Sequence, residues 1–170
     1  MQNLKVNLGI ASLLLAFLMV TNLFAIEIIN DDFDQSATNL AGWKRSSTTY
    51  VYRYTGTNKI GLASMTLISN SWAYTLIKTS IFTNLQLKFS LCGYSLESGE
   101  AISGYYSTNG GSSWILIGSV AYTNGITAKF YNFTKNIPNC NILGIKFAIN
   151  GNSGSDYGYV DNIVLTGVMK

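Results

Sequence analysis

The sequence predicts an all-β fold, an antiparallel β-sandwich (jelly roll), for the part of the chain that follows residue 25. Tyr, Val, Ile, Thr, Phe and Ser dominate there, while Pro138 is the only proline and Gly and Asn mark the turns. Short segments of this composition recur at regular spacing, which is typical of a sandwich or jelly roll. Helical periodicity is absent after residue 25, apart from a short helical turn considered for 35–42.

The first 25 residues have the pattern of a secretory signal peptide. Lys5 precedes the apolar run 8–20, and Ala25 is a small residue after which cleavage can occur. An uncleaved membrane anchor is the alternative, although Thr21 and Asn22 make the run short for a full span. We therefore expect one domain at 26–170, secreted or at the cell surface, with a membrane contact only if the N-terminal segment stays uncleaved.

The expected strands follow the apolar alternation along the chain. They lie at 27–33, 48–55, 60–69, 72–79, 84–94, 100–107, 114–121, 127–134, 142–150 and 158–167. Two of them carry clear core stripes, in which apolar residues alternate with polar ones or glycine. The stripes are Leu85, Leu87, Phe89 and Leu91, and Leu143, Ile145, Phe147 and Ile149.

The last expected strand places a carboxylate among apolar residues. Strict alternation puts Asp161 on one face with Tyr159, Ile163 and Leu165. A buried ionised Asp is costly unless it is paired or bound to a cation. The question is what Asp161 contacts.

The acidic residues gather at the two ends of the domain, and between residues 35 and 155 only Glu97 and Glu100 occur. If the terminal strands pair, the end clusters meet and supply the oxygen ligands that Ca²⁺ prefers. Asp34 and Asp161, with a carbonyl such as that of Asp32, form the predicted set. Alternatively, Asp161 caps the strand end and accepts backbone hydrogen bonds.

Composition excludes several functions. Without Lys5 the domain has 10 basic and 8 acidic residues, a net charge of +2, which argues against nucleic acid as a partner. The chain has no His, so Ser–His, Cys–His and His-based zinc chemistry are excluded. Glu97 and Glu100 lie in a stretch that is typical of a polar hairpin loop, and their spacing does not indicate the two facing carboxylates of a glycosidase. We predict no catalytic residues and no enzyme.

The two cysteines leave two interpretations open. Cys92 and Cys140 are both out of phase with the core stripe beside them, as two bonded cysteines on neighbouring strands would be. Equally, they can be two small buried thiols.

Aromatic side chains are the candidate ligand-binding residues. Tyr50, Tyr52 and Tyr54 share one face of their expected strand, and Trp72 and Tyr74 are likewise in phase with each other on the next aromatic stretch. Flat aromatic rings suit sugar rings, but tyrosine stripes also cover cores or solvated sheet faces. Trp43 and Trp114 are better candidates for the core, and Tyr157 and Tyr159 form another candidate rim.

The segment from Ser107 to Trp114 resembles an Asp-box, with Asn109 in place of Asp and Ser113 in place of Thr. Physically it is a hairpin signal, because Asn-Gly favours the tight turn and Trp114 can pack beneath it. We interpret it as structural. A second motif, Asn132-Phe133-Thr134, is an N-glycosylation sequon.

Three stretches of the sequence form a recognisable set: Asn-Asp-Asp-Phe-Asp with Gly42-Trp43, the segment 93–114, and the final Tyr-Val-Asp-Asn-Ile-Val-Leu. They resemble secreted jelly-roll modules, namely carbohydrate-binding modules and the jelly-roll parts of MAM and reelin domains. In the carbohydrate-binding relatives a structural Ca²⁺ joins the first and last strands. The resemblance therefore implies the same set, Asp34 and Asp161 side chains with the Asp32 carbonyl, although Asn162 stands where many relatives have a second Asp.

Two functions follow as expectations. The first is a secreted, non-catalytic, calcium-stabilised module that binds carbohydrate or mediates adhesion to a glycan or cell-surface polymer. The second is a structural subunit of an extracellular filament or matrix, self-assembled by strand exchange through 26–33 and calcium-dependent. Size in solution separates them, and a secreted enzyme ranks third.

Overall fold

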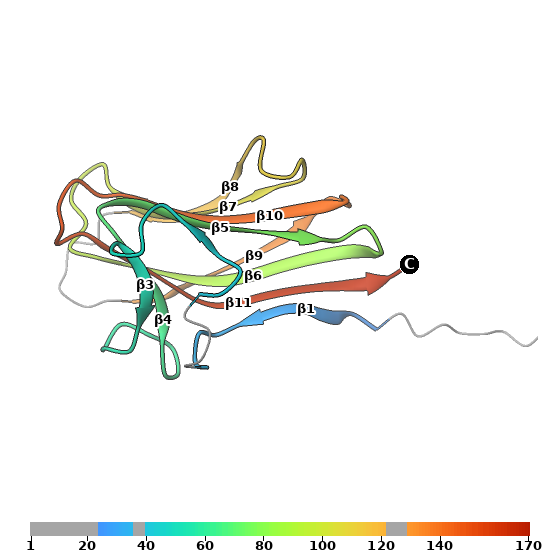
Figure 1. The fold of residues 1–170 in the computed structure, drawn as a ribbon, viewed down its shortest axis with the longest axis horizontal. Helices are drawn as coiled ribbons and strands as arrows, with labels where there is room; N and C mark the ends of the chain where they lie inside the picture. Colours follow the sequence, from blue (N-terminus) through green and yellow to red (C-terminus); the bar gives the residue numbers. More distant parts are fainter. Residues whose placement is uncertain (1–23, 36–39, 122–128) are drawn as a thin grey trace, which may run out of the picture.

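The computed structural model describes residues 24–35, 40–121 and 129–170, which form eleven β-strands and no helix. The strands make two antiparallel sheets that lie face to face as two layers (Figure 1). The predicted all-β sandwich is confirmed. The strands are β1 (Ile26–Asp31), β2 (Lys44–Arg45), β3 (Val51–Tyr54), β4 (Ser64–Ile68), β5 (Asn70–Lys78), β6 (Phe82–Tyr94), β7 (Ala101–Ser107), β8 (Ile115–Ala121), β9 (Tyr131–Ile137), β10 (Ile142–Asn150) and β11 (Tyr157–Met169).

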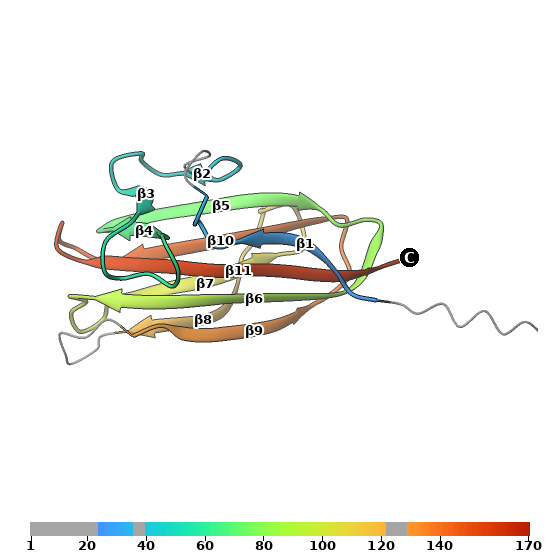
Figure 2. The same cartoon turned by 90° about the horizontal axis from the view of Figure 1, so that it is seen from below.

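The strand order places β11 in the middle of the six-stranded sheet. The six-stranded sheet runs β3-β4-β11-β6-β9, with β1 also paired to β11, and the five-stranded sheet runs β2-β5-β10-β7-β8. One edge of β11 pairs with β6 along most of its length. The other edge pairs first with β4 and then with β1, so the terminal strands lie side by side (Figure 2).

Each of the ten expected strands overlaps an observed one. The sequence pattern does not predict β2, because two residues carry no periodicity. The helical turn considered for 35–42 falls partly on 36–39, outside the described residues, and Leu40 to Gly42 form a turn.

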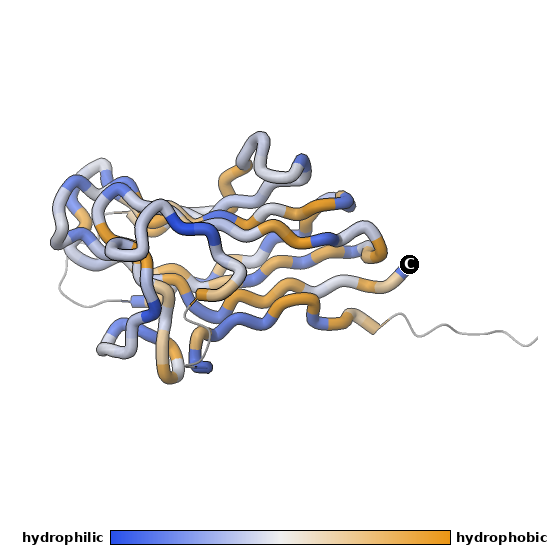
Figure 3. The backbone as a smooth tube through the Cα atoms, in the orientation of Figure 1, coloured by the Kyte–Doolittle hydropathy of each residue, from blue (hydrophilic) through white to orange (hydrophobic). Residues whose placement is uncertain are grey.

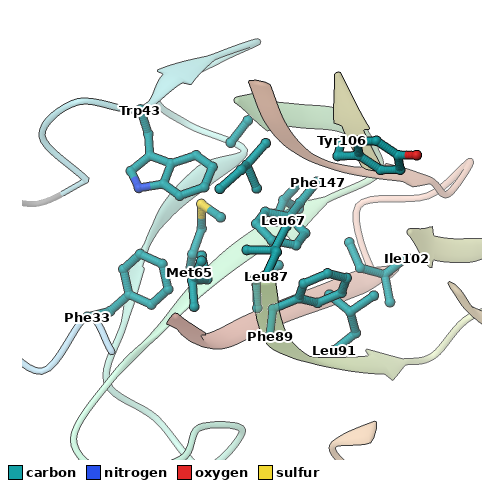
Figure 4. Packing of buried hydrophobic residues seen from close by; sticks show 14 of the residues in the cluster. Phe33, Trp43, Met65, Leu67, Leu87, Phe89, Leu91, Ile102, Tyr106 and Phe147 are labelled. Carbon is teal, nitrogen blue, oxygen red and sulfur yellow. The ribbon is translucent and has the colours of Figure 1, made fainter. Parts of the chain in front are cut away.

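Both predicted core stripes lie between the sheets. The stripe residues on β6 and β10 are all at most 2% exposed. The other large side chains that meet them include Phe33, Trp43 and Met65 (Figure 4). Apolar and polar segments alternate along the strands (Figure 3), as expected for sheets with one face on a core. The predicted burial of Trp43 is confirmed, since this side chain belongs to the core between the sheets.

The last strand departs from simple alternation at Asn162. This residue has a φ of 49°, and the pairing with β6 shifts there, which marks a β-bulge. Val160 before the bulge and Ile163 after it both pack in the core, so Asp161 points to the outer face of the six-stranded sheet. The predicted common face of Asp161 and Ile163 is wrong, because the extra residue reverses the side-chain phase, while Tyr159 stays with Asp161.

The two cysteines are free thiols, so the disulfide interpretation of Cys92 and Cys140 is wrong. Cys140 Sγ lies 3.5 Å from Thr79 Oγ1, just before β6 begins, whereas Cys92 lies near the far end of β6. Ten residues of strand separate these positions by about 30 Å, far beyond disulfide reach. Cys92 is buried, which raises the pKa of its thiol to about 11, and Cys140 is half-buried.

The expected signal segment 1–25 falls almost wholly on residues 1–23, outside the described residues. Within the described ranges, no helix is long and apolar enough to cross a membrane.

Gly104 tests the packing between the layers. A Cβ at this position would lie 2.5 Å from Phe89 Cζ and 3.3 Å from Phe147 Cε1. We expect Gly104→Ala to lower the free energy of unfolding by about 1–3 kcal/mol, because the two rings have no space to retreat. Urea melts measure this cost. Gly154→Ala is the matched control, since a Cβ there meets nothing within 4 Å; equal midpoints for the two variants would contradict the packing described.

Candidate functional site

The candidate ligand-binding aromatic residues are divided between the two sheets. Tyr52 and Tyr54 are on β3, at an edge of the six-stranded sheet, and Tyr50 directly precedes that strand. Trp72 and Tyr74 are on β5, in the five-stranded sheet. The five candidates therefore lie on two separate surfaces, because β3 and β5 belong to different layers.

A groove lies on the outer face of the five-stranded sheet. It has a volume of about 230 Å³ and is lined by Trp72, Tyr74, Trp114, Lys146 and the Gly110-Gly111 turn. The ring centroids of Trp72 and Tyr74 are 5.5 Å apart, and those of Tyr74 and Trp114 are 5.8 Å apart. Trp72 is 38% exposed. The three rings therefore form a continuous aromatic row with solvent access.

The Asp-box-like hairpin places Trp114 in this row. Asn109 Oδ1 accepts the Ser113 N–H at 3.0 Å, and Ser107 Oγ accepts the Gly111 N–H at 2.9 Å, which closes the turn. The left-handed backbone falls on Gly110 and Gly111, with φ of 69° and 90°. The turn is structural in its contacts, as predicted.

Trp114 itself corrects the sequence prediction. It is half-buried rather than in the core, and its ring covers Gly144, where a Cβ would lie 2.9 Å from Trp114 Cη2. Gly144 faces outward because it alternates with the core residues Leu143 and Ile145. The absence of a side chain on Gly144 lets the indole lie flat on the sheet and face the groove.

Two lysines flank the aromatic row. Lys146 Nζ lies 5.0 Å from the ring centroid of Tyr105 and 5.1 Å from that of Trp114, and Lys44 Nζ lies 5.7 Å from that of Tyr74. These distances are typical of cation–π contacts. Burial lowers the pKa of Lys146. No local sequence pattern points to the two lysines or to Tyr105, because only strand pairing brings them beside Tyr74.

A tyrosine cluster lies on the outer face of the six-stranded sheet. The ring centroids of Tyr54 and Tyr159 are 5.3 Å apart, and the stacked rings of Tyr157 and Tyr159 are 6.1 Å apart. The pKa of Tyr52 is raised, first by burial and then by Tyr157 and Tyr54. Tyr159 is only 3% exposed. This cluster packs against the chain that precedes β4 and offers less open ring surface than the groove.

Two carboxylates hold the 55–63 loop onto the six-stranded sheet. Asp161 Oδ2 accepts the Ile60 N–H at 2.7 Å, and its Oδ1 accepts the Asn162 N–H at 2.8 Å. Asp34 Oδ1 accepts the N–H groups of Leu62 and Ala63 at 2.6 and 2.9 Å. Asp161 therefore makes the backbone hydrogen bonds foreseen as one of its two interpretations.

Asp161 is fully buried at the point where the partner of β11 changes from β4 to β1. Burial is the main cause that raises the pKa of Asp161 to about 7, and Asp34 and Asp32 raise it further, while its two backbone hydrogen bonds act in the opposite direction. The three predicted residues thus lie near one another. Among the described residues, however, no group of three or more His, Cys, Asp or Glu side chains is placed to hold a metal ion.

The mid-chain acidic pair has structural contacts. Glu100 is 4% exposed, and its Oε1 and Oε2 accept the N–H groups of Asn152 and Glu97 at 3.0 and 2.7 Å. Glu100 therefore ties together two neighbouring loops.

The fold is shared with known jelly-roll modules. The carbohydrate-binding module TmCBM61, solved with β-1,4-galactotriose, superposes with a TM-score of 0.61 at 14% identity, over 82% of this chain and 97% of that one. The K3 adhesin domain of Lys-gingipain from Porphyromonas gingivalis gives 0.60 at 16% identity, over 83% and 99%. The CBM22-1 xylan-binding domain of Paenibacillus barcinonensis Xyn10C gives 0.57 at 11% identity, over 86% and 97%. No protein-family model matches the sequence, and no curated protein matches it.

These likenesses establish the fold that the sequence motifs led us to expect, a jelly roll like that of carbohydrate-binding modules and adhesin domains. At such low identity they establish no more than the fold.

The raised pKa of Asp161 predicts a pH dependence of stability. Between about pH 4 and pH 7 the folded protein holds a proton on Asp161 that the unfolded chain has lost, so metal-free protein loses stability as pH rises from about 4 to about 7. We expect Asp161→Asn to remove this loss, which amounts to at most about 4 kcal/mol. Urea melts in EDTA between pH 4 and 8 measure it, and parallel pH profiles for the two proteins would contradict it.

Proposed function

We propose that this chain is a secreted, non-catalytic module that binds carbohydrate or mediates adhesion through the groove on the five-stranded sheet. The observation that carries the proposal is the aromatic row of Trp72, Tyr74 and Trp114, with the half-buried Lys146 beside it. A sugar ring has an apolar face that packs on an aromatic ring and hydroxyl groups that bond to polar side chains. The shared fold with carbohydrate-binding modules and adhesin domains supports the proposal.

The groove is preferred over the tyrosine cluster for a physical reason. Tyr54 curls over Gly56, where a Cβ would collide with its hydroxyl, and Tyr159 is almost fully buried. Their ring faces already pack against protein. Trp72 and Trp114 line an open groove, and a rigid aromatic with a free face is the kind of side chain that dominates binding energy.

Trp72 tests the assignment of the surface. We expect Trp72→Ala to weaken binding to the best oligosaccharide on a glycan array by at least about tenfold, because a flat apolar contact is removed. Isothermal titration calorimetry measures the affinity. Tyr50→Ala is the control, since Tyr50 is 47% exposed and lies beside β3. Loss of binding in Tyr50→Ala alone would move the site to the six-stranded sheet.

Calcium is the second part of the proposal. A cation near Asp34 and Asp161, with the carbonyl of Asp32, would offset the buried charge of Asp161 and lock the 55–63 loop to β11. The proposal is supported by the carboxylates of Asp34 and Asp32, which lie close enough to Asp161 to raise its pKa. Arg53 Nη2 donates to the Asp34 carbonyl oxygen at 3.0 Å, which leaves the Asp32 carbonyl as the candidate backbone ligand.

Assembly by strand exchange is the second candidate function. It is favoured by the position of β1, which pairs with β11 alone and has only partly buried apolar residues, Ile28 and Ile29, against the core. A neighbour's β1 would make the same contacts in the same place.

One experiment tests both calcium and assembly. We expect the melting temperature of 26–170 to rise when EDTA is replaced by millimolar Ca²⁺, because an ion that binds only the folded state stabilises it. Asp34→Asn should abolish the rise and Glu97→Gln, an exposed loop carboxylate, should keep it. Light scattering on the same samples should show a monomer. An unchanged melting temperature would overturn the calcium proposal, and large particles with Ca²⁺ would favour assembly.

A further inference from the structure

The charges of the domain are divided unequally between the two sheets. None of the five strands of the five-stranded sheet contains an Asp or a Glu. The same strands carry four basic residues, which are Lys44, Arg45, Lys78 and Lys146. The end clusters of acids belong to β1, to the chain after it, to Asp156 directly before β11 and to β11 itself. Lys44, Lys78 and Lys146 share the outward phase of Tyr74, whereas Arg45 pairs with buried Ala73 and points the other way. The outer face that carries the groove therefore has three lysines and no acidic residue on its strands, although the whole domain is nearly neutral.

Two of these lysines lie in one transverse row across the groove. The pairing registers place Lys44 opposite Tyr74, Tyr74 opposite Lys146, and Lys146 opposite Tyr105. Neighbouring strands are about 4.8 Å apart, so the lysine positions on either side of Tyr74 are about 10 Å from each other. A ligand ring stacked at Tyr74 would have an ammonium group on both sides.

Lys146 is held in the groove by its neighbours. Its ammonium lies between the rings of Tyr105 and Trp114, at about 5 Å from each centroid, and its side chain is half-buried. An ammonium that is partly withdrawn from water and faces no carboxylate on its own sheet attracts an anion more strongly than a solvated surface lysine.

We propose that the groove takes an acidic polysaccharide, whose sugar rings pack on the aromatic row while a carboxylate or sulfate group pairs with Lys146 and Lys44. This inference rests on the proposed function and names its ligand class. A neutral glycan would use the rings and leave both ammonium groups without a counter-charge. Nucleic acid also combines anions with flat rings, but the net charge of +2 for residues 26–170 is small for a nucleic-acid binder.

Matched ligands separate the charge from the sugar backbone. The probes are oligogalacturonate and its fully methyl-esterified form, dextran sulfate and dextran, and a single-stranded oligonucleotide, all titrated calorimetrically at 50 and 300 mM salt. We expect at least one acidic probe to bind at least about tenfold more tightly than its neutral partner, with an affinity that falls as salt rises. The pair that shows the larger ratio distinguishes carboxylate from sulfate.

Matched variants place the anion at Lys146. Lys146→Met keeps an unbranched apolar side chain over Trp114 and Tyr105 and should remove most of the preference for the acidic probe over its neutral partner, because only Lys44 then remains beside the row. Lys88→Met is the control, because it removes the same charge from an exposed position on the six-stranded sheet. Its affinities should equal those of the unchanged protein.

The outcomes distinguish this inference from the function beneath it. Equal affinity for acidic and neutral partners would overturn the acidic ligand and leave carbohydrate binding standing. No binding to any sugar probe here or on the glycan array would overturn both. Tighter binding of the oligonucleotide than of every polysaccharide, or an equal effect of Lys88→Met, would also overturn the assignment to Lys146 and an acidic glycan.

Discussion

The β-bulge at Asn162 is the constraint on which the arrangement of the six-stranded sheet depends. One residue with a φ of 49° lets Val160 and Ile163 both face the core, although they are three positions apart. The partner of β11 changes from β4 to β1 at the same place. Without the extra residue, either Val160 or Ile163 would point to solvent, and the apolar face of β11, one of the two longest strands, would be broken.

The bulge also decides the environment of Asp161. It leaves the carboxylate on the outer face, in the gap between the ends of two partner strands, where the 55–63 loop covers it. Backbone N–H groups from that loop satisfy both Asp161 and Asp34. The carboxylates of Asp161 and Asp34 therefore hold the 55–63 loop at the place where β11 has left β4 and has not yet paired with β1. This arrangement buries the carboxylate of Asp161 away from water.

The outer faces of the two sheets differ in how many of their side chains already contact a loop of the chain. The six-stranded sheet uses its tyrosines and acids to bind its own loop, so these groups are largely occupied. The five-stranded sheet carries an open groove that is lined by aromatic rings, glycines and Lys146. Gly144 is central to this difference, because a side chain there would displace the Trp114 indole from the sheet.

The sequence by itself determined the fold class, the positions of ten strands and the two core stripes, because alternation and turn residues are local signals. It also indicated that Asp34 and Asp161 lie close together, since acids at both ends meet when terminal strands pair. Only the tertiary structure decided which aromatics share a surface, since β3 and β5 are close in sequence yet belong to different layers. It also decided the phase of Asp161, the separation of the cysteines and the row of Lys44, Tyr74 and Lys146. These features depend on a bulge and on pairing between distant segments, and neither leaves a periodic signal in the chain.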